Sequence, residues 1–140
     1  MTFEDIEYAF DFVSSSPPGE HLAVVHRVTG ETFIYSYITD DGDLPDDVDE
    51  NDDYLGIPHK NDLDLGKPLV MEFIRQECPD EIDRILAIFS RRGAYRRYKD
   101  FLETKDLLET WYAFENRRTR EALLKWCAEN ALVVEKKEHQ

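Results

Sequence analysis

The sequence contains few of the residues that form covalent or metal cross-links. Its two cysteines, Cys78 and Cys127, form no CxxC pair and have no zinc-ligand spacing. Its six glycines are scattered, which excludes the glycine-rich loops that bind phosphate or dinucleotides. There is no run of about 18 apolar residues, and four acids in the first 11 residues exclude a secretory signal. We therefore expect a cytoplasmic protein with reduced thiols, no membrane segment and no cofactor.

Catalytic and metal-binding motifs are also lacking. The four histidines are far apart in sequence, and none pairs at helical spacing with an acid and a nucleophile. Cys78 precedes Pro79 at a predicted helix start, where a thiol can be acidified, but a structural role is favoured. The pattern Asp62-Leu63-Asp64 lacks the glycine and the distal glutamate of a calcium loop. We therefore predict no catalytic residue and no metal site, and do not favour an enzyme.

Positive charge is scarce over most of the chain and concentrated in one segment. The chain has 17 Lys and Arg against 31 Asp and Glu, a net charge of −14 at pH 7. Residues 1–90 hold 5 bases and 22 acids, whereas residues 91–125 hold 10 bases and 6 acids. Residues 40–53 hold nine acids and no base. That run predicts an acidic flexible loop, because it cannot bury enough apolar surface to order itself.

The remaining residues predict a single α+β domain over residues 1–140. Apolar residues make up 41% of the chain and aromatic residues 12%, which is enough for a core. Residues 22–28 and 32–38 are rich in β-branched and aromatic side chains and flank Thr29-Gly30-Glu31, so they predict a short β-hairpin. Residues 132–134 could add a third strand, and residues 136–140 are expected to form a frayed tail.

About five or six helices are expected to pack with the hairpin, mostly in the C-terminal half. Thr2 and Asp5 predict the start of a helix over residues 2–13. Pro68 predicts the first turn of another helix, which ends near residue 77. After Pro79, apolar residues at i, i+3, i+4 and i+7 predict an inward stripe, formed by Ile82, Ile85, Leu86 and Phe89.

Three more helical stretches are predicted, over residues 94–105, 107–114 and 118–130. The apolar stripe of the second is out of phase with that of the third, which predicts a break near residues 115–117. By their spacing, the aromatic residues of these helices are expected to lie mainly in the core, among them Tyr95, Tyr98, Trp111 and Trp126.

The basic segment is the one feature with a functional interpretation. It has five cations in nine residues, namely Arg91, Arg92, Arg96, Arg97 and Lys99. Gly93 could leave backbone donors free at the next helix start, which suits an anion. The competing interpretation is structural. Arg96–Asp100 and Lys99–Glu103 are i, i+4 pairs, and the acidic half of the chain could neutralise the arginines.

Three motifs in the C-terminal half resemble a known family. Residues 92–100 (RGAYRRYKD), residues 111–114 (WYAF) and residues 126–130 (WCAEN) are similar to the pattern of Uncharacterised Protein Family 0158, a set of small bacterial proteins. The similarity covers residues 54–134, and the N-terminal part agrees in general layout. Ala131 departs from the family pattern, which usually has glycine there. The resemblance implies a bacterial cytoplasmic protein and supplies no activity.

Three hypotheses for function follow. The first is a non-enzymatic interaction module, in which the cations at 91–99 bind an acidic protein or the acidic loop at 40–53 acts as a decoy for basic surfaces. The second is an enzyme or binding protein for an anionic small molecule that uses the same arginines as clamps. The third is binding to single-stranded nucleic acid, which the net charge of −14 disfavours.

Overall fold

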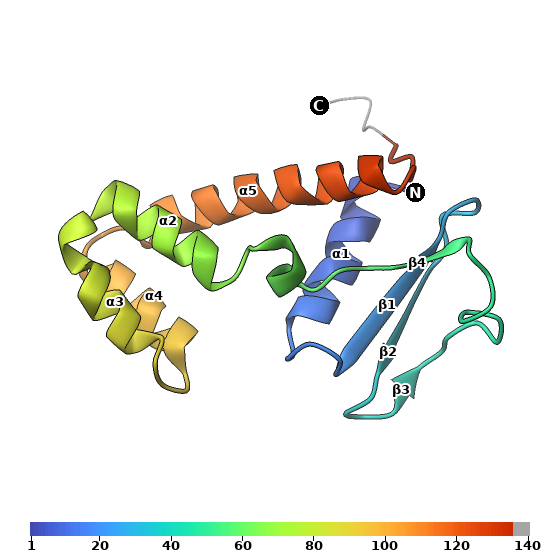
Figure 1. Ribbon diagram of the computed structural model, residues 1–140, viewed down its shortest axis with the longest axis horizontal. Coiled ribbons are helices and arrows are strands. Elements are labelled where there is room, and N and C mark those ends of the chain that lie inside the picture. The colour runs from blue at the N-terminus through green and yellow to red at the C-terminus, as the bar shows by residue number, and fades with distance from the viewer. Residues whose placement is uncertain (136–140) are drawn as a thin grey trace. The chain divides into compact units, whose positions relative to one another are not determined.

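The computed structural model describes residues 1–135, and its contacts divide the chain into two compact units (Figure 1). Unit 1 comprises residues 1–63 together with the chain from residue 120 onward. Unit 2 comprises residues 64–119. The predicted frayed tail at 136–140 lies outside the described residues.

Unit 1 contains a small antiparallel sheet in the order β3-β2-β1-β4. Its strands are β1 (His21–His26), β2 (Thr32–Ser36), β3 (Asp41–Gly42) and β4 (Tyr54–Gly56). The predicted hairpin is therefore confirmed, with Val25 opposite Thr32 next to the turn. Three consecutive residues of β1 are buried, Ala23, Val24 and Val25, so both faces of this strand are covered.

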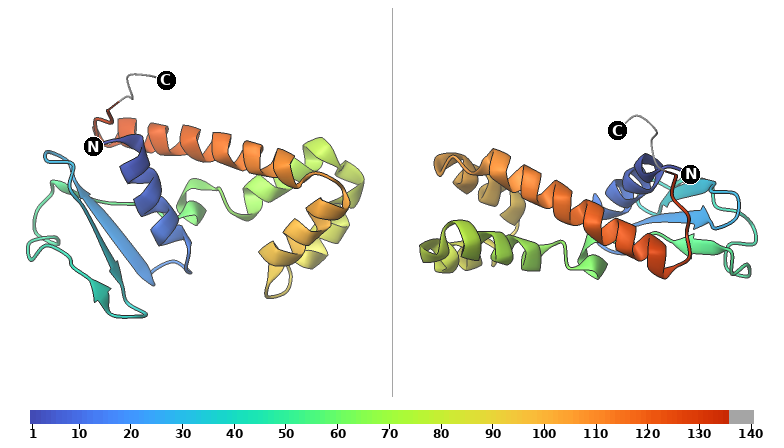
Figure 2. Two further views of the ribbon diagram at one scale, coloured as in Figure 1. Left: turned by 180° about the vertical axis from the view of Figure 1, so that it is seen from behind. Right: turned by 90° about the horizontal axis from the view of Figure 1, so that it is seen from above.

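Helix α1 (Phe3–Ser14) packs against β1 and β2 (Figures 1 and 2). Its first turn is closed by the predicted capping box. The Thr2 hydroxyl accepts a hydrogen bond from the Asp5 amide, and the Asp5 carboxylate accepts one from the Thr2 amide. The face toward the sheet is apolar and consists of Phe3, Ile6, Ala9, Phe10 and Val13.

The acidic segment at 40–53 carries some regular structure. Residues 41–42 form β3 against β2, and the segment then leads through turns to β4. Arg27 from the end of β1 contacts its last residues, donating a hydrogen bond to the Asp52 carbonyl at 2.8 Å and lying 4.0 Å from the Asp53 carboxylate. These contacts help to order the end of the segment. They come from Arg27, which lies outside the segment, so the composition of residues 40–53 alone did not predict them.

The strand that residues 132–134 could have added is absent. Helix α5 (Leu108–Glu129) is instead followed by a left-handed residue, Ala131, with φ of 55°. The chain then turns back so that Leu132, only 5% exposed, covers the helix end. Glu135 pairs with Thr2 in an isolated parallel bridge.

Unit 2 is helical. It contains α2 (Lys67–Glu77), a 3₁₀ turn at Pro79–Glu81, α3 (Ile82–Ile88), α4 (Ala94–Thr104) and the first part of α5. A further 3₁₀ turn at Lys60–Leu63 ends the first stretch of unit 1. The core of unit 2 is an aromatic cluster in which Trp111 lies edge-on to Phe73 and Tyr98, with ring centroids 5.3 and 5.1 Å apart. The predicted burial of Tyr98 and Trp111 is confirmed, while Tyr95 is half-buried.

Two predictions about helices are wrong. Helix α5 runs without a break through residues 115–117. Its two stripes are out of phase because Trp111 and Phe114 are buried in unit 2, whereas Leu123 and Cys127 are buried in unit 1. In α3, which has seven residues, only Ile85 is buried and Leu86 is 41% exposed, so Leu86 does not belong to the inward face.

The predicted fold class is confirmed. A small antiparallel sheet packs with helices, residues 1–135 contain five α-helices, and the C-terminal half is mainly helical. In the same part of the chain, no helix is long and apolar enough to span a bilayer.

Candidate binding site

The five predicted site residues lie on the connection between α3 and α4 and on α4 itself. Arg91 and Arg92 precede Gly93, which adopts the left-handed conformation (φ 72°) at the N-cap of α4. No side chain caps this helix start, as the sequence suggested. The two remaining arginines, Arg96 and Arg97, lie in the first turns of α4. All four arginines are exposed and Lys99 is half-buried.

The predicted neutralisation of this segment by i, i+4 ion pairs does not occur. Arg96 is not paired with Asp100, nor Lys99 with Glu103. Within residues 64–119, all of which the structure describes, none of the five cations lies within 4.0 Å of a carboxylate oxygen. Two of the five side chains contact other groups instead. The Lys99 ammonium lies 5.5 Å from the ring centre of Tyr112, and Arg97 donates to the Ile88 carbonyl at 3.3 Å.

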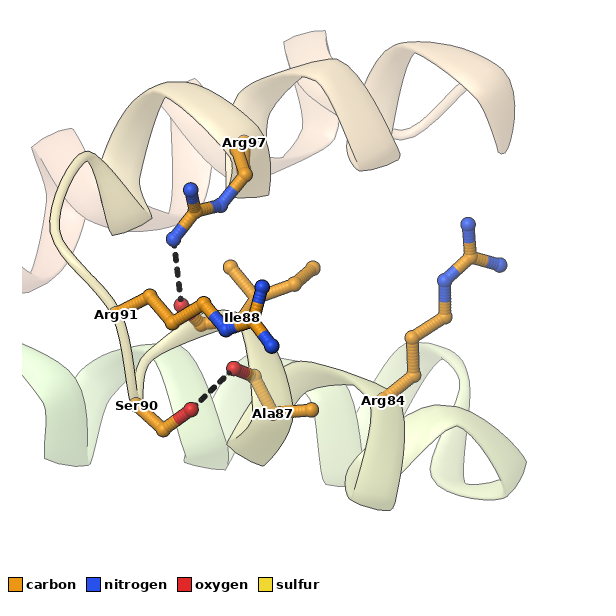
Figure 3. A pocket seen from close by; sticks show the side chains of 6 residues that line it. All are labelled: Arg84, Ala87, Ile88, Ser90, Arg91 and Arg97. Carbon is orange, nitrogen blue, oxygen red and sulfur yellow. Dashed lines mark hydrogen bonds between the residues drawn. The ribbon is translucent and has the colours of Figure 1, made fainter.

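Two of the predicted residues, Arg91 and Arg97, share a pocket with a third arginine. The pocket has a volume of about 310 Å³ and lies between the end of α3 and the first turns of α4 (Figure 3). Figure 3 shows Arg97 reaching from α4 toward the end of α3, with Arg91 close to it and Arg84 standing on α3. Its lining residues are Arg84, Ala87, Ile88, Ser90, Arg91 and Arg97. Arg92, Arg96 and Lys99 do not line it.

Sequence reasoning missed Arg84, which lies seven residues before the basic segment. The signal that could have found it is spacing, since Arg84, Ile88 and Arg91 follow one another at i, i+4 and i+7. Two contacts hold the Arg84 side chain. Its guanidinium is 3.6 Å from a Glu81 carboxylate oxygen and 5.0 Å from the ring centre of Phe101. Glu81 is shared with Lys105, at 3.7 Å, so it only partly neutralises Arg84.

The two units differ sharply in charge. Unit 1 has 20 acids and 6 bases, whereas unit 2 has 11 of each, so the net charge of −14 belongs entirely to unit 1. The arginine pocket therefore lies in a unit with no net charge. An anion that approaches this pocket meets a local positive field, and the net charge of unit 2 does not oppose that field.

Neither of the two free thiols is acidified. Burial, with Glu81 as a second cause, raises the pKa of Cys78, which removes the acidification that its position before Pro79 suggested. Burial also raises the pKa of Cys127. Among residues 1–135, no three His, Cys, Asp or Glu side chains are grouped so that they could hold a metal ion.

The fold and the pocket define the chain as a small α+β protein with an arginine-lined surface pocket. Its sequence matches Uncharacterised protein family (UPF0158) over residues 21–139. The chain therefore belongs to that family, and the match extends to the hairpin as well as to the C-terminal half. No curated protein and no solved structure shows a significant match.

Proposed function

We propose that the protein is a non-enzymatic interaction module that binds an acidic segment of a partner protein through the cations at 91–99. One observation carries the proposal. Within unit 2, these five cations, of which the four arginines are exposed, have no carboxylate partner, although the unit has as many acids as bases. Exposed cations that are left without an internal counter-ion are available to an external one, and charge complementarity of this kind guides association.

The proposed setting is the bacterial cytoplasm. Both cysteines are free, as expected in a reducing compartment. There, the negative charge of unit 1 would disfavour nucleic acid and anionic membranes as partners, while the basic segment would select acidic proteins.

A defined acidic probe tests this function. We expect a fluorescent hexaglutamate peptide to bind the intact protein in a salt-dependent way, and the variant R92E/R96E/R97E to lose that binding. The Debye length falls from about 10 Å at 0.1 M salt to about 3 Å at 1 M, so high salt should abolish binding by the unmodified protein as well. Fluorescence anisotropy measures both effects.

The matched control reverses three other exposed cations, in the variant K67E/R75E/K125E, which has the same net charge as the first variant. If loss of binding follows net charge alone, both variants will bind equally weakly. Equal binding by the two variants, or unchanged binding after the reversal at residues 92, 96 and 97, would refute the proposal.

A second candidate function is binding of an anionic small molecule, which the pocket between α3 and α4 favours. The pocket supplies the concave surface and the guanidinium groups that this hypothesis requires. Neither a carboxylate nor Cys78 lines it, so the residues that would add acid–base or nucleophilic chemistry lie elsewhere. Titration with a small anion such as citrate, followed by calorimetry, tests this candidate separately from the peptide.

A further inference from the structure

We infer that the pocket formed by Arg84, Arg91 and Arg97 is a binding site for a phosphate monoester. The inference rests on the proposed function, because it names the group on an acidic ligand that the basic surface would select. It adds to that function a specific cavity and Arg84, a residue outside the basic segment.

The first argument is charge. Three arginines line one small pocket, none of its six lining residues is acidic, and of the three only Arg84 has a carboxylate partner, Glu81 at 3.6 Å. Neither Arg91 nor Arg97 lies within 4.0 Å of a carboxylate in residues 64–119. Like charges held together repel one another, and an anion bound among them relieves that repulsion. A phosphate monoester has a charge of about −1.5 to −2 at pH 7, about twice that of a carboxylate.

The second argument is the number and geometry of the hydrogen-bond donors. Each guanidinium has five N–H donors in a planar fork that matches the oxygens of a phosphate. Of the donors on Arg97, one is used on the Ile88 carbonyl, which fixes the side chain and leaves the others available. A carboxylate has two oxygens and can occupy one such fork, whereas a phosphate monoester has three terminal oxygens and can accept from more than one guanidinium.

The third argument is the rest of the lining. Ala87 and Ile88 provide apolar surface beside the guanidinium groups, and Ser90 has its hydroxyl committed to the Ala87 carbonyl at 2.7 Å. A ligand in this pocket therefore meets both arginines and hydrocarbon. This arrangement fits the oxygen–carbon junction of a phosphorylated alcohol better than it fits a free inorganic ion, which has no apolar part.

Two labelled peptides test the inference. They share a neutral sequence of Gly and Ala around a central residue, which is phosphoserine in one and glutamate in the other. We expect the phosphoserine peptide to bind about 10-fold more tightly or better, because it makes more charge-assisted hydrogen bonds. We expect R91Q/R97Q to remove that difference, and R92Q/R96Q, a matched pair outside the pocket, to keep it.

Two further variants protect the test against misfolding. The Arg91 side chain makes no hydrogen bond or ion pair in residues 64–119, and its backbone bond to the Ile88 carbonyl does not depend on the side chain, so R91Q alone should fold normally and still weaken phosphopeptide binding several-fold. R84Q should lower the affinity for the phosphoserine peptide more than the affinity for the glutamate peptide. Thermal unfolding of each variant confirms that the fold is retained.

Each outcome has a distinct meaning. If the two peptides bind equally, or if R92Q/R96Q removes the difference between them as R91Q/R97Q does, the phosphate site is refuted while acidic binding survives. If neither peptide nor hexaglutamate binds, the proposed function fails as well. Competition by free O-phosphoserine identifies the source of the group. Competition as strong as that of the unlabelled phosphopeptide supports a phosphorylated small molecule, and competition at least 10-fold weaker supports a phosphorylated protein segment.

Discussion

Replacing Ala131 with glycine should stabilise the protein. Ala131 follows the end of α5 in the left-handed conformation, with φ of 55°. Its amide donates to the Ala128 carbonyl at 3.2 Å, and the Leu132 amide donates to the Cys127 carbonyl at 2.9 Å. These two bonds form a Schellman motif, in which the left-handed position is usually glycine because glycine has no Cβ to clash with the backbone.

The expected gain is the difference between two terms. The left-handed conformation costs a residue with a Cβ about 1–2 kcal/mol, and glycine removes that cost. Glycine also makes the unfolded chain more flexible, which costs about 0.4–1 kcal/mol. The net stabilisation is therefore about 0.5–1 kcal/mol, which corresponds to a rise in Tm of about 2–5 °C for a chain of this size.

Urea denaturation followed by circular dichroism measures the effect, with A128G as the matched control. Ala128 lies three residues earlier, in the last turn of α5, where its conformation is ordinary helix. The same change there should destabilise the protein by about 0.5–1 kcal/mol. If A131G shifts the urea midpoint in the same direction as A128G, the structural explanation of the helix end is wrong.

Four other substitutions test the core and one ion pair. Tyr98 is 0% exposed and its hydroxyl has no hydrogen-bond partner within residues 64–119, so Y98F should stabilise the protein by about 0.5–1 kcal/mol, measured by thermal unfolding. Ile85 is also 0% exposed, so I85A should lower the free energy of unfolding by about 2–5 kcal/mol. Its neighbour Leu86 is exposed, so L86A should lower it by less than about 1 kcal/mol. The Arg118 hydrogen bond lowers the pKa of Glu72 below its ordinary 4.5, so this pair stabilises the fold above that pH and the contribution is lost as the pH falls through the lowered pKa. E72Q should therefore be about 0.5 kcal/mol less stable than the unmodified protein at pH 7, with the two urea midpoints converging below pH 4.5.

The elements that the sequence predicted well depend on local interactions. The hairpin followed from β-branched residues on both sides of Gly30, and the structure places that glycine at φ 78°. The start of α1 followed from the spacing of Thr2 and Asp5, which bond each other across one turn. In both cases the residues that predict the element also form the local interactions that stabilise it. A short stretch of sequence is therefore enough to predict the element.

The predictions that were wrong depend on contacts between distant segments. A change of phase in α5 indicates a kink only if one core lies beside the whole helix, and the division of the chain into two units was not visible in the sequence. Leu86 has the spacing of a core residue, but the short α3 buries only Ile85. Similarly, the spacing of the basic segment allowed i, i+4 ion pairs that do not form. Lys99, for example, contacts the ring of Tyr112 and not a carboxylate.

The candidate site was predictable in part. Charge density alone identified Arg91 and Arg97, but it could not separate them from Arg92 and Arg96, which have the same sequence environment. Only the packing of α3 against α4 distinguishes the arginines that line the pocket from those that do not. The same packing brings in Arg84, which lies in an acidic stretch of sequence and contributes nothing to the basic segment as a sequence pattern.

The long helix α5 has a consequence for local opening. Between Phe114 and Leu123 it has no buried apolar side chain, and the side-chain contacts of residues 115–122 are made by charged groups, such as Arg118 with Glu72 and Arg120 with the Phe3 ring at 4.5 Å. Amide hydrogens in this stretch should exchange with solvent faster than those on either side, which are protected by the cores of the two units. Hydrogen exchange would then divide α5 into two separately protected segments, although its backbone is one continuous helix.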